Sequence, residues 1–299
     1  MAKKISAAPA LKDYKTNTFV DGDMEIRFAV GPEETKTMDT QKLIDNFLVK
    51  DLMVADTIKL VYSHYDRVII GGAVPATRAL TLGNHPELRA AYFLERREMG
   101  IINVGGKGTV TADGQKFDLE KLSCLYLGKG TKKVSFSSAS KKAPAVFYIL
   151  SAPAHATHPN AVFTKEQASP VDLGAAETSN KRTVYKYIHV EGLQSCQLVM
   201  GLTILAPGSV WNSVPPHTHT RRMEAYFYFD LPADQRLFHF MGNPAETRHL
   251  VMANNEAVIS PPWSTHFGCG TTNYGFIWGM AGENLVYSDM DPAPVPTVK

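Results

Sequence analysis

Two histidines stand one residue apart in the stretch PPHTHTRRMEAYFYF (residues 215–229), just before a run of aromatic residues. Side chains alternate across an extended strand, so the imidazoles of His217 and His219 would project to the same face. Their Cα atoms would lie roughly 6.7 Å apart at the rise of a strand. Two imidazoles at this separation can converge on one ion, which raises the question of further ligands.

Two other residues have the chemistry to complete a metal site. Glu224 follows His219 across a four-residue turn and opens the next expected strand, so a hairpin return would bring its carboxylate toward the imidazoles. His266 lies 42 residues beyond Glu224, in SPPWSTHFG, where two prolines stiffen a turn before a strand. Three neutral nitrogens and one carboxylate suit Zn, Fe, Mn, Ni or Co. The pattern therefore predicts a metal site with the ligands His217, His219, Glu224 and His266.

The remaining histidines and a nearby cysteine are weaker candidates. His239 and His249 stand in apolar, strand-like runs, where a hydrogen-bonded structural histidine is the simpler interpretation. His155 and His158, in PAHATHP, suit a cleft lining and a surface loop equally well. Cys269 follows His266 by three residues and is either a soft ligand or, as is commoner for a free cysteine, a buried bystander.

The composition excludes several classes of partner. The chain has 299 residues, 44% of them hydrophobic and 20% charged, which is ordinary for a globular protein. Its 31 basic and 29 acidic residues give no reason to expect nucleic acid or an anionic membrane surface as a partner. The length suits one large β domain or two medium ones.

The termini and cysteines indicate a cytoplasmic location. The opening stretch MAKKISAAPALKDYKTN has no apolar run long enough for a secretory signal. No segment approaches 18 uninterrupted apolar residues, so no transmembrane helix is expected. Three widely spaced cysteines form no CxxC pair, which favours a reduced protein.

Strands must position most of these residues. One short helix is predicted over residues 39–48, with Asp39 as its capping residue. From about Ile58 onward, short β-branched and aromatic runs alternate with turns such as Ala112-Asp113-Gly114. Such regular spacing favours a sandwich or barrel over βαβ units.

The chain divides into two related halves. We expect an N-terminal extension (1–20), a first β half (21–155), a connector poor in strand signals (156–180) and a second β half (181–299). Residues 94–106 resemble residues 220–232 when their Arg-Arg pairs are aligned, which predicts a duplicated β unit. In the first copy, the four ligand positions are then occupied by Tyr92, Leu94, Met99 and Lys133. Only the second copy would bind a metal.

The complete pattern resembles a known family. H-x-H-x4-E followed by a distant histidine is the cupin metal signature. From about Asn17 to Asp291, the chain is similar to the 5-keto-4-deoxyuronate isomerases, also called 4-deoxy-L-threo-5-hexosulose-uronate ketol-isomerases. The segments that carry this likeness are MGIINVGGKGTV, SCQLVMGLTIL, GSVWNSVPPHTHTRRMEAYFYF, ETRHLVM, AVISPPWSTHFG and FIWGMAGEN.

The resemblance implies both a fold and an assembly. The fold would be an all-β bicupin, with two double-stranded β-helix (jelly-roll-like) barrels and few short helices. One Zn2+ per chain would bind in the C-terminal barrel on the four ligands named above, although other divalent metals suit the same donors. A homo-oligomer is expected, and the family suggests a hexamer.

The resemblance also implies a reaction. The substrate would be 5-dehydro-4-deoxy-D-glucuronate and the product 3-deoxy-D-glycero-2,5-hexodiulosonate, in the degradation of pectin or another polyuronide. A divalent cation chelated by adjacent carbonyl and hydroxyl oxygens acidifies the intervening proton and stabilises an enediolate. The sequence does not choose the native metal or the polyuronide, whether pectin, alginate, ulvan or a glycosaminoglycan.

A proton shuttle and a carboxylate anchor are still required. Candidates for the catalytic base are Glu246, His249, Tyr187 and Tyr226. The substrate carboxylate favours a fork of N–H donors, and an isolated polar side chain on an apolar strand needs a partner. The candidates on these grounds are Arg182, Arg222 and Gln197, with solvated surface arginines as the plainer alternative.

Two other function classes fit the same ligands. A cupin with three histidines and one glutamate can hold Fe(II) or Ni(II) and act as a dioxygenase. A sugar-binding or storage module with a vestigial metal is the second alternative. Oxygen consumption distinguishes the first from an isomerase, and turnover of an unsaturated uronate distinguishes the second.

Overall fold

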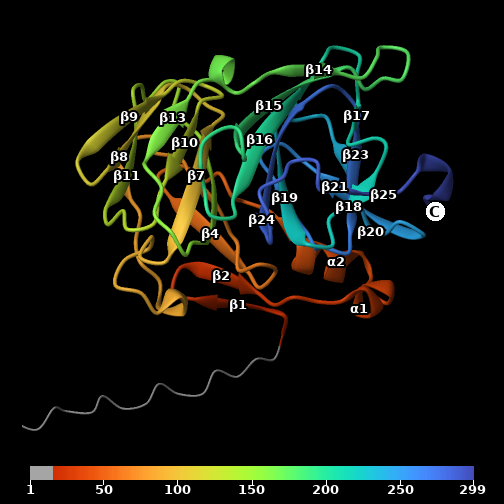
Figure 1. The fold of residues 1–299 in the computed structure, drawn as a ribbon, viewed down its shortest axis with the longest axis horizontal. Helices are drawn as coiled ribbons and strands as arrows, with labels where there is room; N and C mark the ends of the chain where they lie inside the picture. Colours follow the sequence, from red (N-terminus) through yellow and green to blue (C-terminus); the bar gives the residue numbers. More distant parts are fainter. Residues whose placement is uncertain (1–15) are drawn as a thin grey trace, which may run out of the picture.

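The computed structural model describes residues 16–299, which form two β halves side by side (Figure 1). The helices are short: α1 (Pro32–Lys36), α2 (Thr40–Phe47) and three 3-10 turns, η1 (Pro86–Leu88), η2 (Lys165–Gln167) and η3 (Val295–Thr297). The predicted helix is confirmed, because Asp39 caps α2 by accepting a hydrogen bond from the Lys42 N–H at 2.8 Å. No helix among these residues is long and apolar enough to cross a membrane.

The first half consists of two sheets around an apolar core. The larger sheet has the order β1 (Thr18–Asp21), β2 (Met24–Arg27), β4 (Ile58–Ser63), β5 (Ile69–Ala73), β12 (Phe147–Pro153), β7 (Arg97–Asn103), β10 (Cys124–Leu127), β13 (Ala161–Phe163). The smaller has the order β6 (Leu80–Thr81), β11 (Val134–Ser138), β8 (Gly108–Ala112), β9 (Gln115–Leu119). The predicted turn at Asp113-Gly114 joins β8 to β9, with φ values of 48° and 88°.

The second half repeats this plan and adds a two-stranded ribbon. Its larger sheet has the order β14 (Val171–Leu173), β15 (Arg182–Ile188), β16 (Val199–Leu205), β24 (Gly275–Gly282), β19 (Arg222–Phe229), β22 (Ala257–Ser260), β3 (Leu48–Val49). Its smaller sheet has the order β17 (Trp211–Asn212), β23 (Thr265–Gly270), β20 (Leu237–Asn243), β21 (Glu246–Met252). The ribbon pairs β18 (His217–Thr218) with β25 (Asp291–Pro292).

The strand orders agree with the predicted duplication. The series β4-β5-β12-β7-β10 corresponds to β15-β16-β24-β19-β22, and β6-β11-β8-β9 corresponds to β17-β23-β20-β21. The register agrees as well, because Met99 pairs with Leu127 whereas Glu224 pairs with Ser260. The Arg-Arg alignment makes Met99 equivalent to Glu224, and the alignment of residues 126–134 with residues 259–267 makes Leu127 equivalent to Ser260.

The two larger sheets pack against each other across the middle of the molecule. The Tyr148 and Phe227 rings stack at 4.8 Å, and a Cβ on Gly279 would lie 2.2 Å from Leu150. Any side chain at Gly279 would therefore have to displace the side chain of Leu150. The buried Glu98 carboxylate also crosses this interface and accepts hydrogen bonds from three consecutive backbone N–H groups, residues 196–198, and from a tyrosine hydroxyl.

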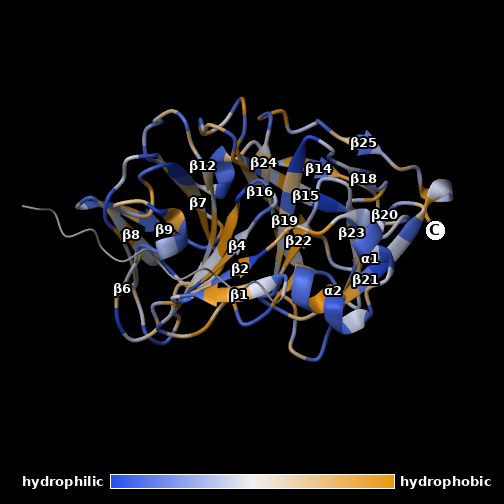
Figure 2. Cartoon of the chain, turned by 90° about the horizontal axis from the view of Figure 1, so that it is seen from below, coloured by the Kyte–Doolittle hydropathy of each residue, from blue (hydrophilic) through white to orange (hydrophobic). Residues whose placement is uncertain are grey.

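The chain crosses between the halves more often than the expected boundaries suggest. Strand β3 belongs to the first segment of the chain, yet it pairs with β22 of the second half. The expected connector contains β13, which joins the first half, and β14, which joins the second. Side chains of β14 are all exposed and those of β13 are only partly buried, so neither strand has a fully buried face to leave a strong hydrophobic pattern. Hydrophobic residues concentrate on the longer strands, whereas α2 is striped (Figure 2).

Candidate metal centre

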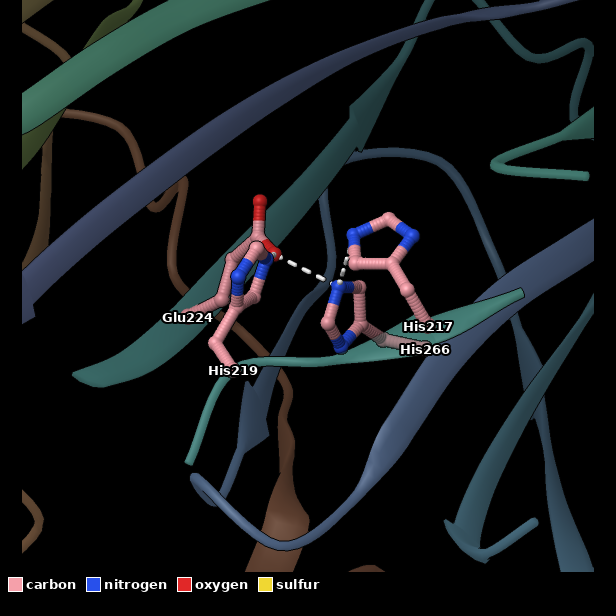
Figure 3. Close-up of side chains that lie close together, drawn as sticks. All are labelled: His217, His219, Glu224 and His266. Carbon is pink, nitrogen blue, oxygen red and sulfur yellow. Dashed lines mark hydrogen bonds and ion pairs between the residues drawn. The ribbon is translucent and has the colours of Figure 1, made fainter. Parts of the chain in front are cut away.

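The four predicted ligands converge on one point in the second half (Figure 3). His217 comes from β18, Glu224 from β19 and His266 from β23, while His219 follows β18 directly. The Nε2 atom of His266 lies 3.1 Å from Nε2 of His217 and 2.7 Å from Oε2 of Glu224. Nε2 of His219 lies 3.0 Å from the same carboxylate oxygen, and all four ligand atoms are within 4.8 Å of one another.

These spacings fit a divalent cation. Ligand atoms that share an ion at roughly 2.1 Å lie roughly 3.0 to 3.4 Å apart in tetrahedral or octahedral geometry. Three distances in the cluster, 2.7, 3.0 and 3.1 Å, lie at or just below the lower end of this range. His219, Glu224 and His266 are almost fully buried, and His217 is half-buried at the edge of a cavity. The donor set therefore can hold one metal ion with a side open to a small molecule.

Strand alternation explains why β19 carries a ligand. Glu224, Tyr226 and Tyr228 share the inward face of the strand, whereas Phe227 faces the sheet of the first half. Residue Glu224 pairs with Ser260 on β22, and a turn closed by the Ser264 N–H on the Pro261 carbonyl leads from there into β23. Neighbouring strands of both sheets thus bring Glu224 and His266 together.

Backbone carbonyls fix the orientation of two imidazoles. The Nδ1–H group of His219 donates to the carbonyl of Asp289 at 2.6 Å, which leaves Nε2 free for an ion. Nδ1 of His266 lies 3.3 Å from the Ser264 carbonyl and 3.2 Å from the Ser260 hydroxyl. Such outer hydrogen bonds select the tautomer that ligates and hold the ring in place.

The protonation states also suit metal binding. Burial, together with the neighbouring His266 and His219, lowers the pKa of His217 to about 3, so this imidazole is neutral near pH 7. Burial raises the pKa of Glu224, but the neighbouring His266 and His219 outweigh burial and bring this pKa below its ordinary range. A neutral imidazole and an ionised carboxylate are the forms that ligate.

A cavity of about 270 Å³ lies beside the cluster. Its volume suits a small metabolite and not a drug-sized ligand. Arg182 is the one guanidinium in its wall, and its Nη1 donates to the Asn180 carbonyl at 2.8 Å. Burial lowers the pKa of Arg182, yet an arginine remains charged near neutral pH. The polar groups of the wall are the hydroxyls of Thr203, Ser213, Tyr226 and Tyr287.

Tyr226 is the one predicted base candidate that lines this cavity. Its hydroxyl lies 2.7 Å from Oγ of Ser213. Burial, and then the charge of Glu224, raise the pKa of Tyr226 well above 10, so the phenol is neutral and can donate a proton or a hydrogen bond. Deeper in the same interior, His239 contacts the Tyr228 hydroxyl at 2.8 Å and is fully buried, as expected for a structural histidine.

The structure does not bring the other base candidates to the cluster. Glu246 and His249 lie on β21 at the edge of the smaller sheet, where both are exposed and Glu246 pairs with Arg248 at 3.2 Å. The hydroxyl of Tyr187 donates to the Leu122 carbonyl in the core between the halves. The stretch ETRH is rich in polar groups because it is an edge strand facing solvent.

Two anchor candidates also lie outside the cavity wall. Arg222 is fully buried and donates from Nη2 to the carbonyls of Tyr287 and Asp289 at 3.2 and 3.1 Å. The side chain of Gln197 donates to the Pro153 carbonyl at 2.6 Å at the interface between the halves. Cys269 has its Sγ 3.8 Å from the Gly270 carbonyl and does not join the ligand group.

Sequence reasoning missed several residues of the wall. Thr203 accepts a hydrogen bond from Nε1 of Trp278 at 3.1 Å, and a lone polar residue in the apolar run LVMGLTIL was the signal for it. Tyr287 and Met290 come from the segment after β24, which has no periodic pattern. No feature of the sequence indicated that this segment returns to the cavity.

Known proteins resemble this chain over most of its length. The model of the KduI/IolB family matches residues 47–294. A 4-deoxy-L-threo-5-hexosulose-uronate ketol-isomerase of Lachnoclostridium phytofermentans is 54% identical over 268 residues, covering 90% of this chain and 97% of the relative. The proteins of that name from Caldicellulosiruptor bescii and Escherichia coli SE11 are 52% and 51% identical, each covering 92% of this chain and 100% of the relative.

Solved structures share the fold at low identity. An IolB-like protein from Salmonella typhimurium LT2 superposes with a TM-score of 0.60 and 16% identity, covering 74% of this chain and 85% of the other. An oxalate decarboxylase from Lactobacillus farciminis, in complex with formate, gives a TM-score of 0.51 and 10% identity, covering 76% and 79%. The architecture is therefore all-β and cupin-like.

Proposed function

Because the chain belongs to the KduI/IolB family, we propose that it is a 4-deoxy-L-threo-5-hexosulose-uronate ketol-isomerase. It converts 5-dehydro-4-deoxy-D-glucuronate to 3-deoxy-D-glycero-2,5-hexodiulosonate. Relatives with that name are 51% to 54% identical across at least 90% of this chain. The observation that carries the proposal is one cavity lined both by three members of the three-histidine, one-glutamate cluster (His217, His219 and Glu224) and by the guanidinium of Arg182.

The proposed cofactor is one Zn2+ per chain on His217, His219, Glu224 and His266. The buried donor set, the tautomers fixed by backbone carbonyls and the ligand spacings support a metal at this position. Zinc would supply Lewis-acid polarisation of the substrate carbonyl without redox chemistry. The equivalent positions of the first half offer no comparable donors, since Leu94 and Met99 are buried in an apolar core.

The protein's own side chains have separate tasks in this proposal. Arg182 binds the substrate carboxylate, because a guanidinium presents paired N–H donors to a carboxylate. This contact orients the opposite, carbonyl-bearing end of the substrate toward the ligand cluster. Tyr226 stays neutral and, with Ser213 as its hydrogen-bond partner, donates a hydrogen bond to an oxygen of the enediolate. The reaction moves one proton between adjacent carbons and one between their oxygens, and it needs no oxidant.

The proposed setting is the degradation of pectin or a related polyuronide in the cytoplasm. The three cysteines Cys124, Cys196 and Cys269 are unpaired thiols, as suits a reducing compartment. We also propose a homo-oligomer, with the first half providing structural support and assembly surface. Light scattering that gives a monomer at micromolar concentration would contradict the assembly.

The decisive experiment uses purified protein and the 4,5-unsaturated uronate monomer, without oxygen, in deuterated water. An isomerase that works through an enediolate keeps its full rate and places solvent deuterium in the product. A dioxygenase, the runner-up for this ligand set, loses its activity without oxygen. A binding module shows no turnover in either atmosphere. A chelator should abolish turnover, and added zinc should restore it.

A further inference from the structure

Residues 283–299, the C-terminal strap, leave β24 and return beside β18 (Figure 1). Tyr287 and Met290 of this strap form part of the cavity wall. Strand β25 of the strap pairs with β18, placing Pro292 opposite His217. Beyond β25, the Ala293 N–H donates to the Pro216 carbonyl at 2.9 Å. The strap thus runs alongside the short strand that carries the first metal ligand.

The strap also supplies the outer hydrogen bond of a second ligand. The carbonyl of Asp289 accepts from Nδ1–H of His219 at 2.6 Å. The orientation of the His219 ring therefore depends on where the backbone of Asp289 lies. Two of the three imidazoles, those of His217 and His219, are positioned by a segment that contributes no ligand of its own.

Two adjacent arginines hold the strap from opposite sides. Arg221 donates from Nε to both carboxylate oxygens of Asp289, at 2.7 and 2.9 Å, and from Nη2 to both oxygens of Asp291, at 3.0 Å each. Arg222, which is buried, donates to the backbone carbonyls of Tyr287 and Asp289. The Arg221 cluster is one cation shared by two bidentate carboxylates, a geometry more favourable than a single surface pair.

The far end of the strap is fixed as well. The backbone N–H of Lys299 donates to the Pro244 carbonyl at 2.9 Å, and its carbonyl accepts from the Thr247 N–H at 2.7 Å. These bonds attach the strap to the turn between β20 and β21. The arginine clamp lies between this attachment and β24, at the point closest to His219.

From this arrangement we propose that the C-terminal strap sets the geometry of the metal centre and that Arg221 is its positioning residue. The inference rests on the metal centre proposed above. Arg221 does not line the cavity and is not a ligand. Its side chain donates to Asp289 and Asp291 of the strap and, from Nη1, to Oγ1 of the adjacent Thr220. The coupling is reciprocal: if the strap tightens metal binding, a bound metal stabilises the strap to the same extent.

The test compares Arg221→Ala with Arg96→Ala in the full chain. Arg96 is the equivalent residue of the first half, and its Nη2 donates only to the carbonyls of Leu88 and Arg89, at 2.7 Å each. Zinc affinity is measured by competition with a chromogenic chelator, without any uronate. Removing an outer-shell contact typically weakens metal binding by about 10- to 100-fold. We expect a loss in this range for Arg221→Ala and none for Arg96→Ala.

A spectroscopic measurement separates positioning from simple destabilisation. Cobalt-loaded Arg221→Ala should show shifted d–d absorption bands, because the orientation of the His219 ring changes. The free energies of unfolding of the two metal-free variants should be similar. If Arg221→Ala does not fold, Asp291→Asn removes half of the clamp without touching the backbone contact of Asp289, and a smaller loss of affinity is expected.

Hydrogen exchange in the unaltered protein tests the reciprocal effect. Removing zinc should accelerate amide exchange in residues 283–299, while exchange in the β8–β9 hairpin of the first half stays unchanged. The proposal would be overturned if folded Arg221→Ala bound zinc with wild-type affinity. It would also be overturned if amide exchange in the strap did not change when zinc was removed. Neither measurement uses the substrate, so a failed isomerase assay would leave this result standing.

Discussion

The two halves of the molecule share a strand order but differ in what fills them. On β7 of the first half, Met99 and Ile101 face an apolar interior completed by Phe136 and Phe147. On β19 of the second half, Glu224 stands at the position of Met99 and faces three histidines. One backbone plan therefore accommodates either a hydrophobic core or a ligand cluster, depending on a few inward-facing residues.

Buried polar atoms in the interior of the second half are hard to supply with hydrogen-bond partners. Buried atoms of the second half without a hydrogen-bond partner in the protein include Nε2 of His239, Oδ1 of Asn212 and Oγ1 of Thr265. Each such atom costs about 1 to 3 kcal/mol unless water or a ligand reaches it. The first half has such atoms too, among them the Tyr148 hydroxyl, but its interior around Met99 and Ile101 is apolar. The comparison suggests that the first half mainly stabilises the fold, whereas the second half carries the chemistry.

Removing two ligands should have the largest effect. In His217→Ala/His266→Ala, metal content should fall from one per chain to none, and turnover should fall by more than about a thousandfold, as expected when a Lewis acid is lost. Elemental analysis and the uronate assay measure both, with circular dichroism to confirm the fold. Two tightly held metals per chain in the unaltered protein would contradict the assignment of chemistry to the second half alone.

A glutamate introduced into the first half, at the position equivalent to Glu224, should destabilise the fold. Met99→Glu buries a carboxylate with no histidine nearby, so the free energy of unfolding should fall by about 3 kcal/mol or more. Met99→Leu is the matched control and should cost less than about 1.5 kcal/mol. Urea denaturation measures both changes. A stable Met99→Glu protein would mean that the interior of the first half is less apolar than its packing indicates.

Loss of the carboxylate anchor should affect substrate binding more than stability. Arg182→Ala removes charge-assisted hydrogen bonds worth about 1.5 to 3 kcal/mol, so kcat/KM should fall by about 10- to 100-fold. Most of the loss should appear in KM if the contact is equally strong in the ground and transition states. Arg182→Lys keeps the charge without the fork and should be intermediate. Unchanged kinetics would remove Arg182 from the site.

Acid should weaken the metal-free second half. Burial lowers the pKa values of His217 and His239 to about 3, so below pH 6.5 the unfolded chain binds protons that the folded chain does not. Stability therefore falls as pH decreases from about 6.5 toward 3. Urea denaturation of chelated protein across this range should show the decline. Zinc should raise the free energy of unfolding in the upper part of this range, because it binds the folded ligand cluster, and equal curves with and without zinc would argue against ligation.

The smallest effect is expected on the outer face of the second half. Glu246→Gln and His249→Ala alter exposed groups on β21 that lie outside the cavity wall. Turnover should stay within about twofold of the unaltered protein, the range typical of surface changes. A loss of several orders of magnitude would make one of them the shuttle base and would require β21 to approach the cavity.

Local geometry explains what the sequence predicted well. The helix at residues 40–47 follows from its Asp39 cap, and the turn at Asp113-Gly114 follows from residues that tolerate positive φ. His217 and His219 converge because an extended strand puts alternate side chains on one side. The Arg-Arg alignment reproduced the register of the duplicated sheets, because a register slip would expose one buried face.

Long-range arrangement explains what the sequence did not predict. Tyr287 and Asp289 reach the metal centre only because the strap folds back across β18, and no periodicity encodes that path. Arg222 and Gln197 were predicted to contact the substrate, whereas in the structure their side chains donate to backbone carbonyls far away in the chain. The alternation of side chains along β21 shows which of them share a face. It does not show that this strand lies at the edge of the smaller sheet.

Strand β3 has a consequence for synthesis on the ribosome. Leu48 and Val49 emerge early, but their pairing strand begins at Ala257, about 200 residues later. At roughly 5 to 20 residues per second, the interval lasts roughly 10 to 40 s. Throughout that time Leu43, Phe47 and β3 lack the sheet on which they are finally buried. The first half can fold around its own core during this interval. The apolar segment formed by Leu43, Phe47 and β3, in contrast, must not associate with neighbouring nascent chains until translation is nearly complete.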